Sequence, residues 1–442
     1  MTPVHHIISP EIISPEAAAG LFLTSLKTPA RILVAVSGGS DSTGLLVALA
    51  SFLQDHSQPG LSLCAATVDH GLRADSADEA RQVAALCAGL GIEHVTRLWQ
   101  GQKPATGIMA AAREARYDLL ADAARELGAD LVVTAHTRDD QEETFAMRAT
   151  RGISAGVGIA DAVLFDRRIW VLRPFLSCRR AAIRAALQKK DISWIEDPSN
   201  EDLKYERVRT RRKLAEEGSP ADPIEGGERR LRLSTAAAEW LEAAFTLHGG
   251  IVGHLSPEAL VAHPALLSYA LGHLVAVLGG QAFPPGRDAL QRILAFIAAG
   301  TPGRMTAGRV VFDLRRNGLY LMRERRSILP LLLKPEQSGI WDGRFEIVNG
   351  SAAAIRVEAG DGDESAGALF ATLPKGIRQR AAAVQPKILD AMGAEISAQM
   401  EGQVAVMPVL APFDRFLTRF DLTFANSVAA VFARKSYLTL PL

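Results

Sequence analysis

Short apolar runs alternate with longer helical segments along the first half of the chain. The runs "RILVAV", "LSLCAATVD" and "ADLVVTAH" are rich in β-branched and other apolar residues. A longer stretch with the apolar spacing of a helix, such as "STGLLVALASFL", follows each run. This rhythm is typical of βαβ units and predicts an α/β fold in which helices cover a doubly wound, mostly parallel sheet. Ligands of such sheets bind at the carboxyl ends of the strands.

The pattern changes after residue 214. The stretch "AEEGSPADPIEGGE", residues 215–228, collects Gly, Pro and acidic residues and predicts a linker. Helical spacing continues to about Gly300, and "GRVVFDLRRNGLYLMRERR" then predicts a β-hairpin that turns at Asn317 and Gly318. Beyond the break "PEQSG", the segments "WDGRFEIVNG" and "KSYLTLPL" predict short strands.

These breaks predict three domains. A chain of 442 residues is too long for one ordinary core. We expect an α/β domain that contains the parallel sheet, then a helical domain with the hairpin, and then a small α+β domain. Their boundaries are residues 1–215, 216–330 and 331–442.

Charge and cysteine content narrow the classes of function. Lys plus Arg equals Asp plus Glu at 49 each, so local basic patches would have to meet any polyanionic partner. The three cysteines, Cys64, Cys87 and Cys178, are far apart in sequence and form no C-x-x-C pair. A structural zinc site, an iron–sulfur cluster and a disulfide framework are therefore not expected.

The sequence predicts neither a leader peptide nor a membrane span. The first residues lack the basic stretch of a signal peptide, and Glu11 and Glu16 interrupt any apolar core. Residues 260–280 contain no Asp, Glu, Lys or Arg, but they include Pro264 and two histidines. We expect a buried helix that begins at Pro264, and no membrane partner. The expected location is the cytoplasm.

The hexapeptide "SGGSDS", residues 37–42, lies between the first predicted strand and its helix. Free backbone N–H groups and the positive end of a helix dipole hold phosphate oxygens at such a loop. The loop lacks the lysine of a Walker loop and the spacing of a dinucleotide fingerprint. The residues expected to bind a nucleotide are Ser37, Gly38, Gly39, Ser40, Asp41 and Ser42. Asp41 is also the expected Mg²⁺ ligand, because a carboxylate beside a phosphate chain suits that ion.

The loop and several further motifs resemble those of a known enzyme family. The loop looks like the PP-loop, S-G-G-x-D-S, of the N-type ATP pyrophosphatase superfamily, whose members cleave ATP between the α and β phosphates. The motifs "VDHGLR", "AAAREARY", "AHTRDDQEET", "RPFL" and "WIEDPSNEDLKYERVRTR" resemble signatures of the tRNA(Ile)-lysidine synthetase family, in the expected order. The match covers roughly residues 30 to 213. It departs at Met109, where many relatives have Glu, and at Val208, where Asn is usual.

This resemblance implies a reaction and its substrates. The family adenylates the wobble cytidine of an isoleucine tRNA with anticodon CAU, and the ε-amine of L-lysine then displaces AMP to give lysidine. The implied cofactors are ATP and Mg²⁺, and the implied partners are L-lysine and tRNA(Ile). The oligomeric state stays open, a homodimer included.

Other functions fit the sequence less well. A tRNA thiolase with the same loop would use cysteines or an iron–sulfur cluster, which three scattered cysteines do not favour. GMP, NAD or asparagine synthetases would not need the basic tract that begins at Lys204. A non-catalytic RNA-binding protein is disfavoured because the serines and Asp41 of the loop are intact.

A histidine and two carboxylates follow the fourth predicted strand. A helix is expected to begin at Arg138 or Asp139, which places Asp140 and Glu143 on one face beside the loop. We expect these two carboxylates to hold the lysine ammonium and to accept its proton. The alternative, compensation of the helix dipole, accounts for Asp139 and in part for Asp140, but not for Glu143. His136 is expected near the phosphates or the reacting base, unless it is a structural histidine.

Two more residues are candidate nucleotide contacts. Asp69 ends the second predicted strand, where it either contacts a ribose or caps the following element. Arg113 lies three residues before Arg116 on a predicted helix. These arginines either contact phosphate or belong to a solvated helix face.

Two basic segments are candidate tRNA contacts. Residues 204–213, "KYERVRTRRK", contain six basic residues against one acidic, and residues 303–326 contain seven arginines against two acidic. Because RNA affinity depends largely on neutralised phosphates, both segments are expected to contact tRNA, the alternative being solvated faces. The expected contacts are Arg207, Arg211, Arg212, Lys213, Arg315 and Arg316. The family pattern implies that Arg207 acts nearer the chemistry.

Overall fold

The chain forms two compact units. The computed structural model describes residues 11–72, 75–150, 158–196, 204, 206–217, 223–362, 370–390, 392–396 and 403–442. The first unit comprises Met1–Arg230 with Thr418–Phe420 and Leu438–Leu442, and the second comprises Leu231–Leu417 and Asp421–Tyr437. The predicted division at residues 215 and 330 stays a prediction.

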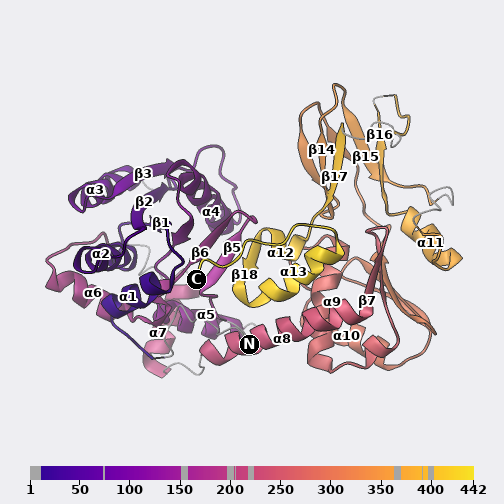
Figure 1. Ribbon diagram of the computed structural model, residues 1–442, viewed down its shortest axis with the longest axis horizontal. Helices are drawn as coiled ribbons and strands as arrows, with labels where there is room; N and C mark the ends of the chain where they lie inside the picture. Colours follow the sequence, from indigo (N-terminus) through magenta and orange to yellow (C-terminus); the bar gives the residue numbers. More distant parts are fainter. Residues whose placement is uncertain are drawn as a thin grey trace. The chain divides into compact units, whose positions relative to one another are not determined.

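Helices surround one sheet in the first unit (Figure 1). Its helices are α1 (Pro15–Ser25), α2 (Ser40–Asp55), α3 (Ser76–Gly89), α4 (Ile108–Glu126), α5 (Arg138–Thr150), α6 (Arg180–Lys189) and α7 (Glu206–Glu217). The strands of the sheet are β1 (Ala30–Ala35), β2 (Leu61–Asp69), β3 (Glu93–Leu98), β4 (Leu131–Val133), β5 (Ala162–Phe165), β6 (Ile169–Leu172) and β18 (Phe416–Thr418).

The direction in which the chain builds this sheet reverses beside β1. The strand order is β18-β5-β6-β4-β1-β2-β3. β1 pairs in parallel with β2 and β4, β2 with β3 and β4 with β6, while β5 is antiparallel to β6. This confirms the predicted doubly wound, mostly parallel sheet. The reversal places the ligand crevice of such a fold at the carboxyl ends of β1 and β4.

Burial explains why the central strands are continuous apolar runs. Residues 32–34 of β1 and 131–133 of β4 are completely buried, as expected for parallel strands covered on both faces. Close helix packing brings α6 to the same region. A Cβ on Gly44 of α2 would lie 2.3 Å from Cγ2 of Ile183 in α6. The missing side chain at Gly44 therefore allows the two helices to approach.

The second unit joins a five-stranded antiparallel sheet to helices and to two smaller sheets (Figure 1). Its helices are α8 (Pro223–Ala244, which begins in the first unit), α9 (Pro264–Gly279), α10 (Arg287–Ala298), α11 (Lys375–Ala382), α12 (Ala411–Asp414) and α13 (Leu422–Val431). The large sheet has the order β7-β8-β11-β10-β9 and contains β7 (Phe245–His248), β8 (Val252–Leu255), β9 (Gly303–Ala307), β10 (Val310–Arg315) and β11 (Gly318–Arg323). The small sheets, β12-β15-β16 and β13-β14-β17, contain β12 (Leu331–Leu333), β13 (Ser338–Trp341), β14 (Phe345–Asn349), β15 (Ile355–Ala359), β16 (Pro386–Leu389) and β17 (Val404–Pro408).

The predicted hairpin is confirmed, with its turn shifted by one residue. β10 and β11 pair as far as Arg315 and Gly318, so Arg316 and Asn317 form the turn. Gly318 is needed for a different reason. A Cβ on it would lie 2.1 Å from the carbonyl oxygen of Leu255 in β8. The glycine therefore permits the close approach of a neighbouring strand.

Three parts of the chain differ from the sequence prediction. β7 and β8 lie in a segment that was predicted to be helical. The prediction failed there because strands of four residues are too short to show a period in the sequence. Gly249 and Gly250 form the turn between the two strands. The predicted strand "KSYLTLPL" is an extended tail, and the Trp170 indole N–H donates to the Leu438 carbonyl at 3.2 Å. α7 and α8 extend into the predicted linker, whose residues 218–222 lie outside the described residues.

The long uncharged segment forms the buried helix that the sequence predicts. α9 begins at Pro264, and Leu271, Leu274 and Val275 within it are completely buried. In the described part of the chain, we find no helix with both the length and the apolar character needed to cross a bilayer.

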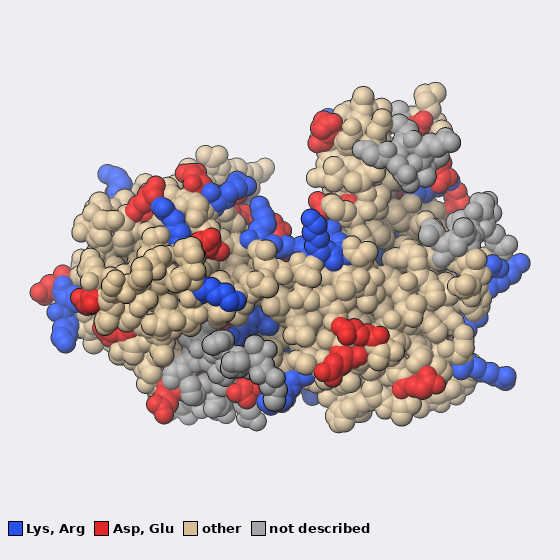
Figure 2. Space-filling view, viewed as in Figure 1, with Lys and Arg blue, Asp and Glu red and all other residues tan. Residues whose placement is uncertain are grey.

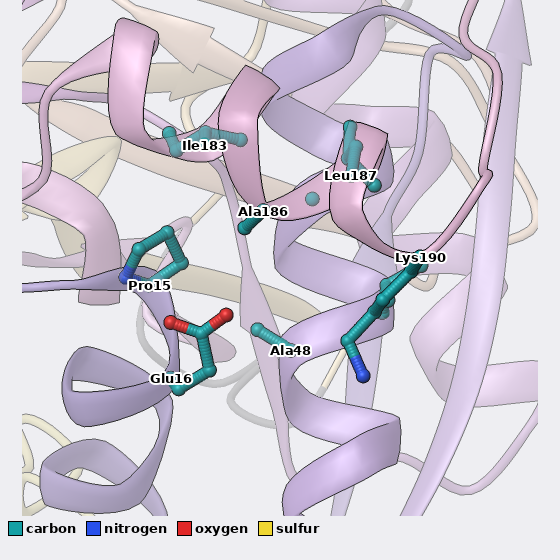
Figure 3. Close-up of a pocket in the computed structure, with 9 residues that line it drawn as sticks. Pro15, Glu16, Ala48, Ile183, Ala186, Leu187 and Lys190 are labelled. Atoms are coloured by element: carbon teal, nitrogen blue, oxygen red, sulfur yellow. The ribbon is translucent and has the colours of Figure 1, made fainter.

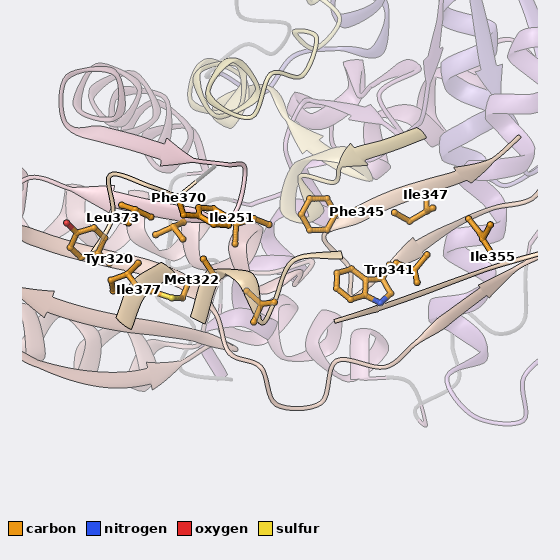
Figure 4. Close-up of a cluster of buried hydrophobic side chains, with 14 of the residues drawn as sticks. Ile251, Tyr320, Met322, Trp341, Phe345, Ile347, Ile355, Phe370, Leu373 and Ile377 are labelled. Carbon is orange, nitrogen blue, oxygen red and sulfur yellow. The ribbon is translucent and has the colours of Figure 1, made fainter. Parts of the chain in front are cut away.

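A buried apolar cluster holds α11 on the second unit (Figure 4). Tyr320 and Met322 of β11, Trp341 of β13 and Phe345 of β14 are buried in it. Ile377 of α11 is completely buried in the same cluster. This anchor fixes the remaining side chains of α11 beside β11.

We expect Gly44→Ala to destabilise the first unit. The added methyl group would force α2 and α6 apart, and such overpacking costs about 1–3 kcal/mol. Thermal unfolding should show a fall in Tm of several degrees. Gly89→Ala at the end of α3 is the control, since a Cβ there meets nothing within 4 Å. An unchanged Tm for Gly44→Ala would contradict the packing described for α2 and α6.

Candidate active site

The loop after β1 turns directly into α2. Gly38 has a φ of +85°, and a Cβ on it would lie 2.5 Å from Cδ1 of Ile195. Gly39 is the N-cap of α2, which begins at Ser40. The first N–H groups of a helix have no intrahelical partner, so the loop presents them at the carboxyl end of β1.

Hydroxyl groups fix the shape of this loop. The Ser37 backbone N–H donates to Ser42 Oγ at 3.1 Å, and Ser42 Oγ donates to the Gly39 carbonyl at 3.1 Å. Thr43 Oγ1 donates to the Gly38 carbonyl at 3.2 Å. The loop is therefore held in shape by its own side chains before any ligand binds.

Asp41 lies in the first turn of α2 and pairs with an arginine of α6. Arg180 Nε donates to Asp41 Oδ2 at 2.9 Å, and Ser40 Oγ donates to Oδ1 at 3.2 Å. Burial raises the pKa of Asp41, and Arg180 offsets only part of this effect. A further cation at this carboxylate would stabilise its charged form.

α5 begins at Arg138, as predicted, and presents two buried carboxylates. Asp140 Oδ2 accepts hydrogen bonds from the backbone N–H and the hydroxyl of Thr137, at 2.7 and 2.9 Å. Glu143 follows on the same face and is only 2% exposed. Arg180 Nη2 donates to Asp140 Oδ1 at 3.0 Å, and Arg180 Nη1 lies 3.7 Å from Glu143 Oε1.

Two arginines of α7 complete the pairing of these carboxylates. Arg207 Nη2 donates to Asp140 Oδ1 at 2.9 Å, and Arg207 Nε donates to Glu143 Oε2 at 2.5 Å. Arg211 Nε donates to Glu143 Oε1 at 2.7 Å. A spacing of four residues places Arg207 and Arg211 on one face of α7, so this face is the one that packs on α5.

Together these residues form what we call the carboxylate–arginine cluster. Its members are Asp41, Asp140, Glu143, Arg180, Arg207 and Arg211, so its formal charges cancel. Burial alone would raise the pKa of Asp140, but Arg207 and Arg180 outweigh burial and lower it. Burial would lower the pKa of Arg180, but Asp41 and Asp140 raise it. The cluster is thus a set of mutually stabilised charges at the ends of β1 and β4.

His136 follows β4 and lies in a positive environment. Its Nδ1 is 3.1 Å from Thr134 Oγ1. Burial and then the charge of Arg173 lower the pKa of His136 to about 3, against a partial opposing effect of Asp140. The ring is therefore neutral near pH 7, with one hydrogen-bond donor and one acceptor.

A buried tyrosine links Arg113 to Arg173. Arg113 Nη2 and Arg173 Nη2 donate to the Tyr117 hydroxyl at 3.3 and 3.2 Å. Arg173 is 2% exposed, and its Nη1 donates to the Ala160 carbonyl at 2.6 Å. Burial alone would raise the pKa of Tyr117, but Arg173 and Arg113 lower it. Arg113 therefore has a fixed guanidinium, although it lies on an exposed part of α4.

Asp69 shapes the loop that follows β2. Its Oδ1 accepts a hydrogen bond from the Gly71 backbone N–H at 2.7 Å, which is the geometry of an Asx turn. Nearby, Arg116 Nε donates to His70 Nε2 at 3.4 Å. One oxygen of Asp69 is thus used within the loop, and neither the ribose contact nor the capping role is tested by this contact.

The remaining predicted tRNA contacts are not members of this cluster. Arg212 and Lys213 are exposed on α7. In the second unit, Arg315 pairs with Asp313 at 2.9 Å, and Arg316 lies in the hairpin turn. Figure 2 shows Lys and Arg interspersed with Asp and Glu on the displayed face, in keeping with the overall charge balance.

Arg180, which joins the loop at residues 37–42 to α5, was not predicted from the sequence. It lies 139 positions from Asp41, so no local pattern could reveal the contact. One signal was present. α6 has Arg179 at its N-cap and Arg180 next, with no acidic residue in its first turn. Basic residues at a helix N-terminus oppose the dipole and indicate that outside carboxylates compensate them.

A small pocket between α1, α2 and α6 is not a candidate site (Figure 3). Its lining includes Glu16, Ala48, Leu187 and Lys190. Its volume of about 10 Å³ suits at most one water molecule. A search of the described residues also finds no group of three or more His, Cys, Asp or Glu arranged to hold a metal ion.

The loop at residues 37–42 lies at the reversal point of a doubly wound sheet, where such folds bind ligands, and residues 14–218 match the family model described as "PP-loop domain". The tRNA(Ile)-lysidine synthase of Rhizobium meliloti is 45% identical over 442 residues, which cover 95% of each chain. That of Mesorhizobium japonicum is 38% identical over 93% of this chain and 94% of its own. The chain belongs to the tRNA(Ile)-lysidine synthase family.

One solved structure is a more distant match. A U34-tRNA thiolase of Methanococcus maripaludis with a 4Fe–4S cluster matches with a TM-score of 0.36 and 17% identity, over 46% of this chain and 78% of that chain. This likeness is too low to support a statement on fold or function.

We expect His136→Gln to reduce the loss of stability at acid pH. The folded-state pKa of about 3 lies below the ordinary value of 6.5, so the unfolded chain binds the proton first. The wild type therefore loses stability as the pH falls below about 6.5. Gln cannot titrate, so the difference in Tm between variant and wild type should be constant above pH 7 and should move in favour of the variant towards pH 5. A constant difference throughout would contradict the lowered pKa.

Proposed function

We propose that the protein ligates L-lysine to the wobble cytidine of tRNA(Ile) with anticodon CAU, converting ATP into AMP and pyrophosphate. The cytosine carbonyl oxygen first attacks the α-phosphorus, and pyrophosphate leaves. The lysine ε-amine then attacks the carbon that carries the AMP group, and AMP leaves to give lysidine. The observation that carries this proposal is the 45% identity to a tRNA(Ile)-lysidine synthase over 95% of both chains.

The loop at residues 37–42 would hold the ATP phosphates. Asp41 with phosphate oxygens is a donor set that suits Mg²⁺, which is often bound through one carboxylate and substrate phosphates. The pKa of Asp41, raised by burial, supports a further cation at this carboxylate. When bound, Mg²⁺ would neutralise charge on the phosphate chain. Asp69 would offer its second oxygen to the ribose.

Arg113 and His136 would act on the same substrate. The guanidinium of Arg113 is fixed by Tyr117, so it can meet a phosphate without losing further side-chain freedom. The neutral ring of His136 can donate a hydrogen bond to a phosphate oxygen or to the reacting base. Both residues would therefore position the reacting groups.

Asp140 and Glu143 would hold the lysine ammonium and accept its proton. An ε-amine with an ordinary pKa of about 10.4 must lose a proton before it attacks, and a carboxylate beside it supplies the acceptor. All four oxygens of the two carboxylates already accept hydrogen bonds, from Thr137, Arg180, Arg207 and Arg211. The ammonium would therefore have to replace a guanidinium contact, and the displaced guanidinium would need another anionic partner.

Basic side chains at and near these carboxylates would bind the tRNA. Arg207 and Arg211 lie at the carboxylates, where they would meet the anticodon end of the substrate. Arg212 and Lys213 are exposed on the same helix. In this proposal residues 1–215 are the catalytic domain, 216–330 bind tRNA and 331–442 form a further domain. Because tRNA and ATP are cytoplasmic substrates, we place the reaction in the cytoplasm.

The cysteines do not favour a thiolase. All three are buried as free thiols. Burial raises the pKa of Cys87 to about 11 and, with a smaller effect of Glu16, that of Cys178 to about 12. Since the thiolate is the nucleophile in sulfur transfer, such thiols are unsuited to it.

We expect Asp41→Asn to reduce the rate of pyrophosphate release by more than about a hundredfold, while the affinity for tRNA changes little. The variant keeps the shape of the side chain but removes the charge proposed to support Mg²⁺. Pyrophosphate release is measured with ATP and tRNA, and tRNA affinity by filter binding. Asp55→Asn, an exposed change at the end of the same helix, is the control. Normal pyrophosphate release by Asp41→Asn would refute its assignment.

Glu143→Gln should separate the two steps of the reaction. Adenylation uses the phosphate loop, so pyrophosphate should still be released, whereas transfer of labelled lysine to tRNA should fall by about a hundredfold or more. The matched control is Glu142→Gln, one residue earlier, where the carboxylate pairs with Arg179 at 2.7 Å through both oxygens. Unimpaired lysine transfer by Glu143→Gln would show that the lysine pocket lies elsewhere. A wild type that labels no tRNA would refute the proposed reaction itself.

A further inference from the structure

Two arginines of the second unit bind one buried carboxylate, and a third arginine lies opposite it in the sheet. Asp313 of β10 is 4% exposed. Arg315 Nε donates to Asp313 Oδ1 at 2.9 Å, and Arg380 Nη2 of α11 donates to Oδ2 at 2.5 Å. Arg304 of β9 is directly opposite Asp313 in the antiparallel ladder, so their side chains share a face of the sheet. One negative charge therefore faces three positive charges.

The guanidinium groups meet beside the first turn of α11. A Cβ built on Gly376 would lie 3.8 Å from Arg380 Nη1 and 3.9 Å from Arg315 Nη2. The side chains of Arg315 and Arg380 are 33% and 30% exposed, and Arg304 is exposed. Apart from Asp313, the described part of the chain offers Arg315 and Arg380 no hydrogen-bond acceptor. Arg380 Nε is buried, and Arg315 Nη2 also donates to Asp313, so the groups left for a ligand are those at the exposed ends of the two guanidiniums.

The second unit contains a buried cluster of the same stoichiometry that serves as a comparison. Asp342 pairs with Arg309, Arg323 and Arg344. There the spare donors bond to backbone, since Arg323 Nη1 donates to the Arg326 carbonyl at 3.2 Å and Arg344 Nη2 to another carbonyl at 2.7 Å. Arg323 and Arg344 are 1% and 5% exposed, and Arg309, which is 32% exposed, donates through Nη1 to the Gly280 carbonyl at 3.4 Å. The Asp342 cluster is therefore complete within the protein, and the Asp313 cluster is not.

We propose that Arg304, Arg315 and Arg380 form a binding site for the sugar–phosphate backbone of tRNA. The proposal rests on the proposed function, in which tRNA is the substrate. Asp313 holds two of the guanidinium groups in a fixed orientation, and the excess positive charge is neutralised by phosphates. Planar guanidinium forks match phosphate oxygens in pairs. Burial, and to a smaller extent repulsion from Arg304 and Arg315, lowers the pKa of Arg380 against the effect of Asp313.

The surroundings favour a nucleic-acid backbone over an acidic protein. Stable protein interfaces have an apolar core. None of the exposed large apolar side chains in the described residues lies on β9, β10, β11 or α11. Arg316 in the adjoining turn adds a further positive charge. A surface with several cations and no apolar anchor suits phosphodiester groups.

The test is the salt dependence of tRNA affinity for the double variant Arg304→Gln with Arg380→Gln. Each lost phosphate contact reduces the slope of log Kd against log salt by about 0.7–0.9, so we expect a slope lower by about one to two and a Kd about three- to tenfold weaker at low salt. Arg356→Gln, an exposed and paired arginine of β15, is the control. Arg304→Lys keeps the charge and should keep the wild-type slope. A double variant whose slope and Kd equal those of the control would overturn the proposal.

A second measurement separates this proposal from the proposed function. The variants carry no change in the carboxylate–arginine cluster, so lysine transfer at saturating tRNA should equal that of the wild type, with only KM for tRNA raised. If the wild type forms lysidine and the double variant has an unchanged KM, the phosphate site alone is wrong. If the wild type forms no lysidine, the proposed function is wrong, and the salt slope with the same tRNA still decides on the site.

Discussion

The pairing of Glu143 is the constraint on which the arrangement of the first unit depends. A carboxylate that is 2% exposed must be paired, and removal of one partner from a buried pair costs about 3–5 kcal/mol. The partners come from α6 and α7, at residues 180, 207 and 211. α7 has little apolar surface to bury, with its strongly basic sequence, so these ion pairs largely determine where it docks on α5.

The sheet topology explains why one guanidinium can serve two loops. β1 and β4 are neighbours in the sheet, although about 100 residues separate them in the chain. Their carboxyl ends therefore bring Asp41 and Asp140 close enough for Arg180 to contact both. Any change in the position of Arg180 therefore alters its contact with Asp41 in the loop at residues 37–42 and its contact with Asp140 in α5. The cluster is thus a physical connection between the proposed ATP and lysine sites.

Local patterns predicted the parts of this site that depend on local structure. The strand–loop–helix context of residues 37–42 and the start of α5 at Arg138 follow from apolar runs and helix spacing. Arg180 could not be predicted because its contacts are long-range and its helix lies outside the motifs. β7 and β8 were not predicted because each has only four residues. The final residues resemble a strand in sequence, but they pack as an extended tail whose backbone carbonyl accepts from Trp170.

Pairing between arginines and buried carboxylates has different consequences in the carboxylate–arginine cluster of the first unit and around Asp313 in the second unit. In the carboxylate–arginine cluster, with Asp41 included, the charges cancel, so a cationic substrate can enter only by exchange with a guanidinium. Around Asp313 the positive charge is in excess, so an anion can be added without any exchange. Under the proposed function, lysine binding would therefore be sensitive to what holds Arg207 and Arg211. A tRNA that drew either arginine towards its phosphates would free a carboxylate oxygen for the lysine ammonium. Under the proposed function, charge neutrality in the first group would thus make amino-acid binding depend on the presence of the nucleic acid.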